Sequence, residues 1–162
     1  MQPIHTADFK RGFSLIEVLV SAAIMASGLA GLAALLLSAL TGTARAADHT
    51  AAAMLADAML ARVQLSPTVP DSFIAAGPAS GLDCTAAQAC SAAQFAAAGL
   101  GAWQQAVARE LPGGQGQVCL DDTPFDGSGT APACDGGTRL VVKVFWSASP
   151  GPTGQRLVRL VY

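Results

Sequence analysis

The chain has 162 residues, of which 52% are apolar and only 12% are charged, and its net charge is −2. This balance excludes the basic composition that is typical of nucleic-acid-binding proteins, so no nucleic acid is expected as a partner. It also excludes a largely disordered chain, which would be polar and highly charged. With two histidines, His5 and His49, the sequence offers little material for a histidine-based metal or acid–base site.

The N-terminal part of the chain contains a long apolar segment. Residues 13–40 carry a single charge, Glu17. As a helix, this segment would be about 42 Å long, which exceeds the roughly 30 Å hydrocarbon core of a bilayer. Lys10 and Arg11 lie directly before it, and such a basic flank keeps the N-terminus in the cytoplasm while the rest is exported. We therefore expect one pass through the inner membrane, with residues 41–162 forming a periplasmic globular head.

Two general interpretations explain this segment incompletely. A removed secretory signal fits the basic start and the Ala-Arg-Ala sequence at residues 44–46, but the apolar region of such a signal is usually about 7–15 residues long. A plain membrane anchor leaves Glu17 unexplained, because a carboxylate at the centre of a spanning helix costs about 2.5–3.5 kcal/mol. The cost is smaller near a helix end, so the plain anchor stays open as an alternative.

A third interpretation uses the whole pattern at the start of the segment. Residues 10–20 read Lys-Arg-Gly-Phe-Ser-Leu-Ile-Glu-Val-Leu-Val. They combine a basic pair, a glycine before an aromatic residue, an acid at a fixed offset and a long apolar run, and this resembles the processing site of type IV prepilins. The resemblance implies that residues 1–12 are a leader, which prepilin peptidase cleaves between Gly12 and Phe13. It further implies N-methylation of Phe13 and retention of residues 13–40 as the membrane-spanning, filament-core half of a helix.

The same resemblance implies a role for Glu17 in assembly. The amine of mature Phe13 and the carboxylate of Glu17 are each costly in hydrocarbon, and both costs fall when the two groups pair. Between neighbouring subunits this pair would set the axial stagger. The expected partners, besides prepilin peptidase, are therefore other minor and major pilins.

Helical spacing continues beyond the apolar segment. We expect one helix over about residues 13–65, whose second half packs on a domain. The apolar stripe of this second half and the side chains that flank it are Ala51, Leu55, Ala58, Arg62 and Leu65, with Met54, Met59 and Val63. Residues 66–83 carry several Pro and Gly residues, so a loop is expected there.

A second, shorter helix and three strands are expected in the rest of the chain. Ser91 and Gln94 form a capping box, which predicts the start of the helix. Its expected apolar residues are Phe95, Leu100, Trp103, Val107 and Leu111. Strands are expected at residues 115–120, 139–147 and 155–162, the last two pairing as an antiparallel hairpin. The sequence thus predicts an α+β fold, with a long N-terminal helix packed on a small antiparallel sheet, and this matches the pilin resemblance.

Features of the second half of the chain resemble one group within the type IV pilins. They are Trp103, the sequence Leu-Pro-Gly-Gly-Gln-Gly-Gln-Val at residues 111–118, and the Phe145-Trp146 pair at a strand end. Together they are similar to the PilV-type minor pilins (type IV pilus modification proteins). One departure is Gly99, four residues before Trp103, where that family often has an acid; the central loops also differ, which affects loop-borne partner contacts rather than the fold.

Four cysteines in an exported head are expected to form two disulfides. Three pairings are possible, and we favour Cys84–Cys90 with Cys119–Cys134 because each closes a local loop. A zinc site is disfavoured, since the sequence has neither C-x₂-C spacing nor a nearby histidine. The Asp-rich loop at residues 121–135 has oxygen donors that suit Ca²⁺, but its spacing is not that of an EF-hand. A solvated turn is the simpler interpretation, and no metal or other cofactor is predicted.

The leading functional hypothesis is a structural one. It is a minor pilin that is anchored in the inner membrane and then joins, or primes, a type IV pilus. The alternatives are a minor pseudopilin of a type II secretion system and an adhesin-like binding module at the pilus tip. An enzyme is not expected, because His49 is the only histidine left after leader removal and no G-x-S-x-G sequence is present.

Overall fold

The computed structural model describes residues 12–66, 73–74, 84, 90–147 and 154–161. The chain divides into two compact units, Met1–Thr43 and Ala44–Tyr162. Helix α1 (Leu15–Gln64) begins in the first unit and ends in the second. Apart from Gly12, the predicted leader lies outside the described residues, as does most of the predicted loop at 66–83.

Helix α1 is continuous over 50 residues. It forms because the segment is rich in Ala and Leu and free of Pro, and it ends shortly before Pro67, which cannot continue a helix. Its bounds agree with the predicted span of about 13–65. Within the first unit, every residue from 12 to 40 is exposed.

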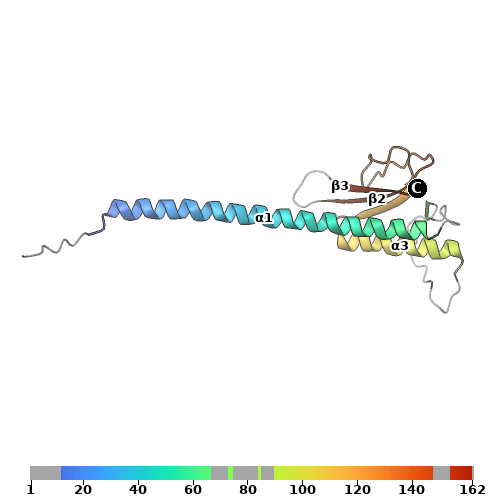
Figure 1. Cartoon of the computed structure of the whole chain (residues 1–162), viewed down its shortest axis with the longest axis horizontal. Coiled ribbons are helices and arrows are strands. Elements are labelled where there is room, and N and C mark those ends of the chain that lie inside the picture. The colour runs from blue at the N-terminus through green and yellow to red at the C-terminus, as the bar shows by residue number, and fades with distance from the viewer. Residues whose placement is uncertain (1–11, 67–72, 75–83, 85–89, 148–153, 162) are drawn as a thin grey trace, which may run out of the picture. The chain divides into compact units, whose positions relative to one another are not determined.

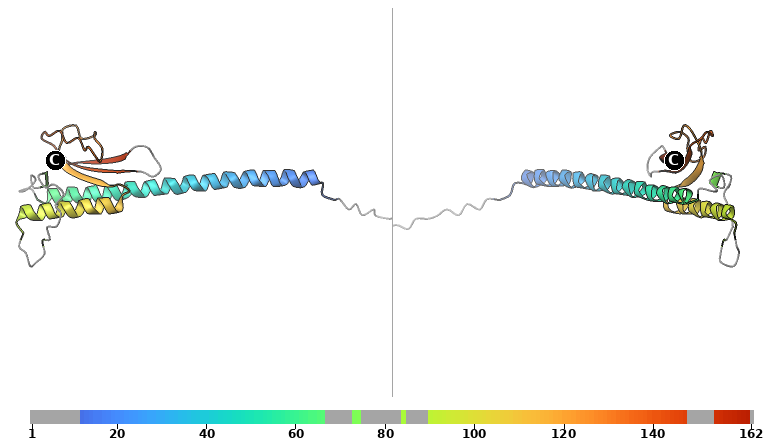
Figure 2. Two further views of the ribbon diagram at one scale, coloured as in Figure 1. Left: turned by 180° about the vertical axis from the view of Figure 1, so that it is seen from behind. Right: turned by 45° about the vertical axis from the view of Figure 1, so that its right-hand side comes forward.

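The second unit contains the end of α1, helix α3 (Ala92–Glu110) and a three-stranded sheet. The strands are β1 (Gln115–Leu120), β2 (Leu140–Ser147) and β3 (Gly154–Val161), all antiparallel in the order β1-β2-β3. In Figures 1 and 2, α3 runs alongside the second half of α1, and the sheet lies over this helical pair. The predicted α+β, pilin-like architecture is therefore confirmed.

The sequence signals for these elements operate as expected. Ser91 caps α3: its side chain accepts a hydrogen bond from the amide of Gln94, while the Gln94 side chain accepts one from the amide of Ser91. The helix ends at Glu110, and the Pro-Gly-Gly turn that follows leads directly into β1. In that turn Gly113 has a positive φ of 60°, which a glycine adopts without strain.

The inner face of the sheet forms the core with the two helices. Val118 on β1 and Val142, Val144 and Trp146 on β2 are buried against side chains from α1 and α3. Trp103 joins these layers, since its indole Nε1 donates a hydrogen bond to the carbonyl of Leu55 at 2.8 Å. Gly116 makes room for this indole, because a Cβ at that position would collide with the Trp103 ring.

The buried face of α1 differs from the predicted stripe. The buried residues are Ala52, Ala56, Met59 and Val63, whereas Ala58, Arg62 and Leu65 are exposed. Alanines on several sides of the helix leave the buried face ambiguous in the sequence, and Ala52 and Ala56 are the ones that join the core formed with α3 and the sheet. Arg62 instead donates a hydrogen bond to the Gly99 carbonyl at 3.1 Å. On α3, Phe95 is also exposed rather than part of the apolar face.

The outer face of the sheet is covered by the loop at residues 121–139. Cys119, Val141, Lys143 and Phe145 are buried there, and the Cys119–Cys134 disulfide ties this loop to β1. A second disulfide joins Cys84 to Cys90. Each bond closes a local loop, which is the pairing favoured by the sequence.

Candidate functional site

The predicted processing site lies where the chain enters α1. Residues 12–14 are not helical, and α1 begins at Leu15. The carbonyl of Ser14 accepts hydrogen bonds from the amides of Glu17 (3.0 Å) and Val18 (3.3 Å). Phe13 is 81% exposed and precedes the helix, so a new amine at this residue would not interrupt any helical hydrogen bond.

Glu17 lies in the first turn of α1. A carboxylate at this position is favoured by the unpaired amides at the start of a helix. Among the described residues 12–40, it is the single ionisable side chain, and it is exposed. The structure therefore places a single carboxyl group near the start of an otherwise apolar surface.

The first half of α1 presents large apolar side chains to its surroundings on all sides. Those exposed by half or more include Ile16, Leu19, Ile24, Leu29, Leu32, Leu36 and Leu40. By length and composition, α1 is able to cross a membrane: its most apolar window has a mean hydropathy of 2.1, and none of that window is buried by the rest of the chain. Soluble proteins rarely leave an apolar surface of this extent in water.

Hydroxyl groups in this half of α1 bond to the helix itself. Ser21 donates to the carbonyl of Glu17 at 2.7 Å, Ser27 to Ile24 at 2.8 Å, and Thr41 to Ser38 at 2.9 Å. In hydrocarbon, where water is absent, an unpaired hydroxyl would be costly. These polar residues are therefore compatible with a membrane environment.

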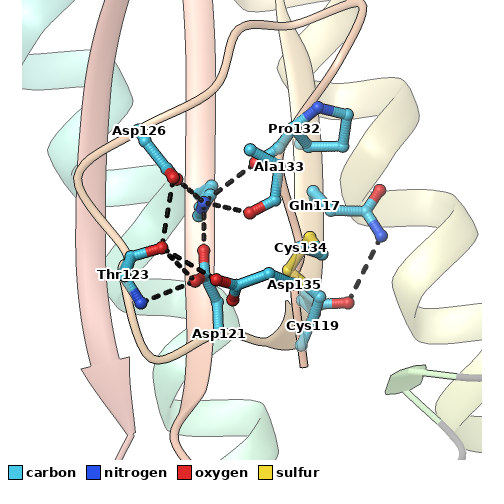
Figure 3. Close-up of a disulfide and its surroundings, with 12 residues drawn as sticks. Gln117, Cys119, Asp121, Thr123, Asp126, Pro132, Ala133, Cys134 and Asp135 are labelled. Carbon is cyan, nitrogen blue, oxygen red and sulfur yellow. Dashed lines mark hydrogen bonds and ion pairs between the residues drawn. A yellow bond between two sulfur atoms is a disulfide. The ribbon is translucent and has the colours of Figure 1, made fainter. Parts of the chain in front are cut away.

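A second cluster of functional groups lies on the outer face of the head. The Asp-rich loop was predicted to be a solvated turn or a calcium site, and the first of these is wrong for Asp121. This carboxylate is fully buried and forms an ion pair with the fully buried ammonium of Lys143 on β2. Figure 3 shows Asp121, Thr123, Asp126 and Asp135 gathered beside the Cys119–Cys134 disulfide.

Oxygen atoms surround the Lys143 amine. Nζ donates to Asp126 Oδ1 at 3.2 Å, to the Pro132 carbonyl at 2.8 Å and to the Ala133 carbonyl at 3.4 Å. The donor set that suggested calcium is thus organised around a cation from the chain itself. No group of three or more His, Cys, Asp or Glu side chains suited to a metal occurs among the described residues.

Burial and the neighbouring groups shift the pKa of the Asp121 carboxyl in opposite directions. Burial by itself would raise the pKa of the Asp121 carboxyl, because it disfavours the charged form. Hydrogen bonds with Lys143, with the Asp135 side chain and with the Thr123 amide, together with the positive charge of Lys143, outweigh this and hold the pKa below its ordinary value. The Thr123 amide bond to Asp121 Oδ1 measures 2.8 Å.

Sequence reasoning missed Lys143 as a member of this cluster. The alternation along residues 139–147 places it on one face of a strand, but not opposite any particular loop. The available signal was a single lysine in an apolar strand that follows a disulfide-closed, Asp-rich loop. His49, expected as a surface or packing residue, is exposed and meets the Trp146 ring edge-on, with the ring centroids 5.0 Å apart.

Comparison with known proteins identifies one feature of the chain. A family model described as "Prokaryotic N-terminal methylation motif" matches residues 9–33. No curated protein and no solved structure matches the chain. The motif covers the predicted cleavage site and the start of α1 but not the head, so the prepilin-like signal is present, and together with the apolar helix it fits a membrane-anchored, pilin-like protein.

Proposed function

We propose that the protein is a minor pilin that is incorporated into, or primes the assembly of, a type IV pilus. The observation that carries this proposal is the methylation motif directly before a helix half that is exposed and apolar on all sides. Lipid would keep this apolar surface out of water before assembly, and the equivalent helices of other subunits would do so afterwards. The role is structural, and the pilin-like motif is one of structural rather than catalytic proteins.

Processing would convert the precursor into the assembling subunit. Prepilin peptidase removes residues 1–12, cleaving between Gly12 and Phe13, and the new Phe13 amine is methylated. Support comes from the exposed, non-helical backbone at residues 12–14, which a peptidase can reach without unwinding α1. Gly12 has no neighbouring atom within 4 Å of where a Cβ would lie, so no packing in the protein itself requires glycine there.

Glu17 would then act as the counter-ion of a Phe13 amine during assembly. This role is supported by the position of Glu17, which is the one ionisable side chain in the long apolar stretch that would begin at the mature N-terminus. Each of the two charges loses hydration in the membrane, and pairing compensates for part of that loss. Partners are therefore other pilins, whose own helices supply the matching amine.

The proposed topology has the N-terminus in the cytoplasm and the head in the periplasm. Lys10 and Arg11 before α1 support this orientation. The two disulfides, Cys84–Cys90 and Cys119–Cys134, support it independently, because such bonds persist in an oxidising compartment.

A pilus is favoured over a secretion pseudopilus by features of the head. They are Trp103 and the Leu-Pro-Gly-Gly turn, which the sequence shares with PilV-type minor pilins. In the structure both contribute to the same core: Leu111 is buried with Trp103, and the turn leads into the strand that carries Gly116. A pseudopilin of type II secretion is the alternative that the experiment must separate.

The test combines mass spectrometry with crosslinking in intact cells. The mature protein should begin at N-methylated Phe13 and carry two disulfides, and its crosslinked neighbours should be pilus subunits. Neighbours from a secretion system would establish the pseudopilin alternative, and host ligands alone would favour an adhesive module. An intact N-terminus at Met1, in cells with active peptidase, would contradict the whole assignment.

A further inference from the structure

Lys143 contacts the chain beside each end of the Cys119–Cys134 disulfide. Its ammonium pairs with Asp121, two residues after the first cysteine. It also donates hydrogen bonds to the carbonyls of Pro132 at 2.8 Å and Ala133 at 3.4 Å (Figure 3), the two residues before the second cysteine. One buried cation therefore holds the two cysteine-bearing segments together without a covalent bond.

The register of the sheet places this cation close to the first cysteine. Cys119 on β1 pairs with Val141 on β2. Lys143 is two residues further along β2, so it shares the outer face of the sheet with Val141 and Cys119, and all three residues are buried. A buried ammonium is unfavourable unless acceptors surround it. Lys143 therefore favours the loop conformation that brings the carbonyls of residues 132 and 133 onto this face.

The backbone next to the second cysteine is in an unfavourable conformation. Ala133 has a φ of 51°, and it is the one residue other than glycine with a positive φ in the described part of the chain. A Cβ disfavours this left-handed conformation, which persists only where the surroundings hold it. Here the carbonyl of Ala133 is bound by the Lys143 amine, and the disulfide at Cys134 follows directly. One ionic and one covalent constraint thus act on the same piece of backbone.

We propose that Lys143 is a positioning residue for this disulfide, holding residues 132–133 in the conformation that presents Cys134 to Cys119. In the reduced protein, the ammonium keeps the two thiols close together and so raises their effective concentration for each other. Because such a coupling is reciprocal, the closed disulfide in turn stabilises the buried ion pair. The inference concerns the head alone and does not depend on the assignment as a pilin.

The test is the thiol–disulfide equilibrium of the purified full-length protein in detergent, measured in mixtures of reduced and oxidised dithiothreitol. One dithiothreitol molecule reduces one protein disulfide and closes into its own cyclic disulfide, so two electrons and two protons pass to the cysteines. Free thiols are then alkylated and located by tryptic mapping. Cleavage after arginine places the Cys84–Cys90 disulfide in the peptide 63–109 and the Cys119–Cys134 disulfide in the peptide 110–139. Each disulfide is therefore measured in its own peptide.

Lys143→Met should make the Cys119–Cys134 disulfide easier to reduce, because the unbranched side chain is kept but the ammonium is lost. Groups in one network typically change each other's equilibria by about twofold to more than a hundredfold. We expect half reduction at a ratio of reduced to oxidised dithiothreitol that is about tenfold lower. A Cys119–Cys134 equilibrium equal to that of the wild type would overturn the proposal.

Two controls separate this role from general stability. The Cys84–Cys90 disulfide of the same Lys143→Met molecules should keep its wild-type equilibrium. Asp122→Asn is the matched control within the loop, since Asp122 bonds to the Thr138 amide rather than to Lys143. It should leave both disulfides unchanged, and a tenfold shift of Cys119–Cys134 in this variant would contradict a role specific to Lys143.

Ala133→Gly should shift the equilibrium in the opposite direction. Glycine adopts a positive φ without strain, so the Cys119–Cys134 disulfide should resist reduction at least about twofold better than in the wild type. If Lys143→Met shifts both disulfides equally, the head as a whole is destabilised, and Ala133→Gly decides because it relieves strain without removing a contact of the amine. An unchanged equilibrium in Ala133→Gly would then overturn the proposal.

Discussion

The two halves of α1 form one continuous helix but have opposite surroundings. From residue 12 to residue 40 every side chain is exposed, including leucines such as Leu29 and Leu36. In the second half, Ala52, Ala56 and Met59 are completely buried in the head. The first half is apolar all round and is not buried by any other residue that the structure describes, whereas the second is apolar on one side, which is packed in the head. Folding thus buries the apolar side of the second half, whereas the proposed burial of the first half, in lipid or among other subunits, would need other molecules.

Gly12→Val should have the largest effect, because it should block processing while the head still folds. A branched side chain at the cleaved bond obstructs the peptidase, so the precursor should accumulate in the membrane, with mature protein reduced to a trace. The head should fold as before, because a Cβ at Gly12 would meet no described atom within 4 Å beyond its chain neighbours. The measurements are the N-terminal mass and the two disulfides. Normal maturation of this variant would remove Gly12–Phe13 as the processing site.

Glu17→Gln should leave processing and membrane level intact but impair assembly. Loss of one partner of a buried charge pair typically costs about 3–5 kcal/mol, which is at least a hundredfold in equilibrium terms. Glu17→Asp, which keeps the charge with a shorter reach, should be intermediate. The measurement is crosslinking to neighbouring pilins at equal membrane abundance, with Ser21→Ala as the control. Equal crosslinking by Glu17→Gln and wild type would leave Glu17 as a tolerated boundary residue.

Trp103→Ala should damage the head and spare the membrane half. The buried indole fills the space over Gly116 and bonds to the Leu55 carbonyl, so its removal should cost about 3–5 kcal/mol of unfolding free energy. Phe95→Ala is the matched control on the same helix, because Phe95 is 68% exposed, and its cost should stay within about 0.5 kcal/mol. Denaturant unfolding of the full chain in detergent measures both, and similar losses would contradict the packing described for α3.

Acid should produce the smallest effect, and it acts on the buried ion pair of the head. The partners of Asp121 hold the pKa of its carboxyl below the ordinary value of about 3.9. Stability from the pair is therefore complete above that value and is lost as the pH falls through the lower, folded-state pKa. Thermal unfolding between neutral and strongly acidic pH measures this loss, and Lys143→Met, which lacks the partner cation, should not show it.

Local signals predicted the elements well, because each rests on neighbouring residues. The capping box at Ser91 marks the start of α3, Pro67 accounts for the end of α1, and alternation defines β2. The motif before α1 is likewise a matter of fixed spacing, so it is legible without a structure. These features depend on chain geometry over a few residues rather than on distant contacts.

Features that depend on distant contacts were less accessible. The buried face of α1 was assigned to the wrong residues because alanines occur on several sides of the helix, and the position of α3 decides among them. The pairing of Lys143 with Asp121 joins residues 22 positions apart, across a loop whose path no local pattern predicts. Burial of a charge is unfavourable unless its partner is known, so sequence reasoning placed Asp121 in water.

The side-chain hydroxyl groups in the first half of α1 affect how neighbouring subunits could align along the helix axis. Because Ser21, Ser27 and Thr41 direct their donors to carbonyls of their own helix, the described surface from 12 to 40 offers neighbouring helices few directional interactions apart from Glu17. If such helices pack against one another, apolar contacts alone would favour no single axial position strongly. On the proposed role of Glu17, its pairing with a neighbouring Phe13 amine would then select one axial position.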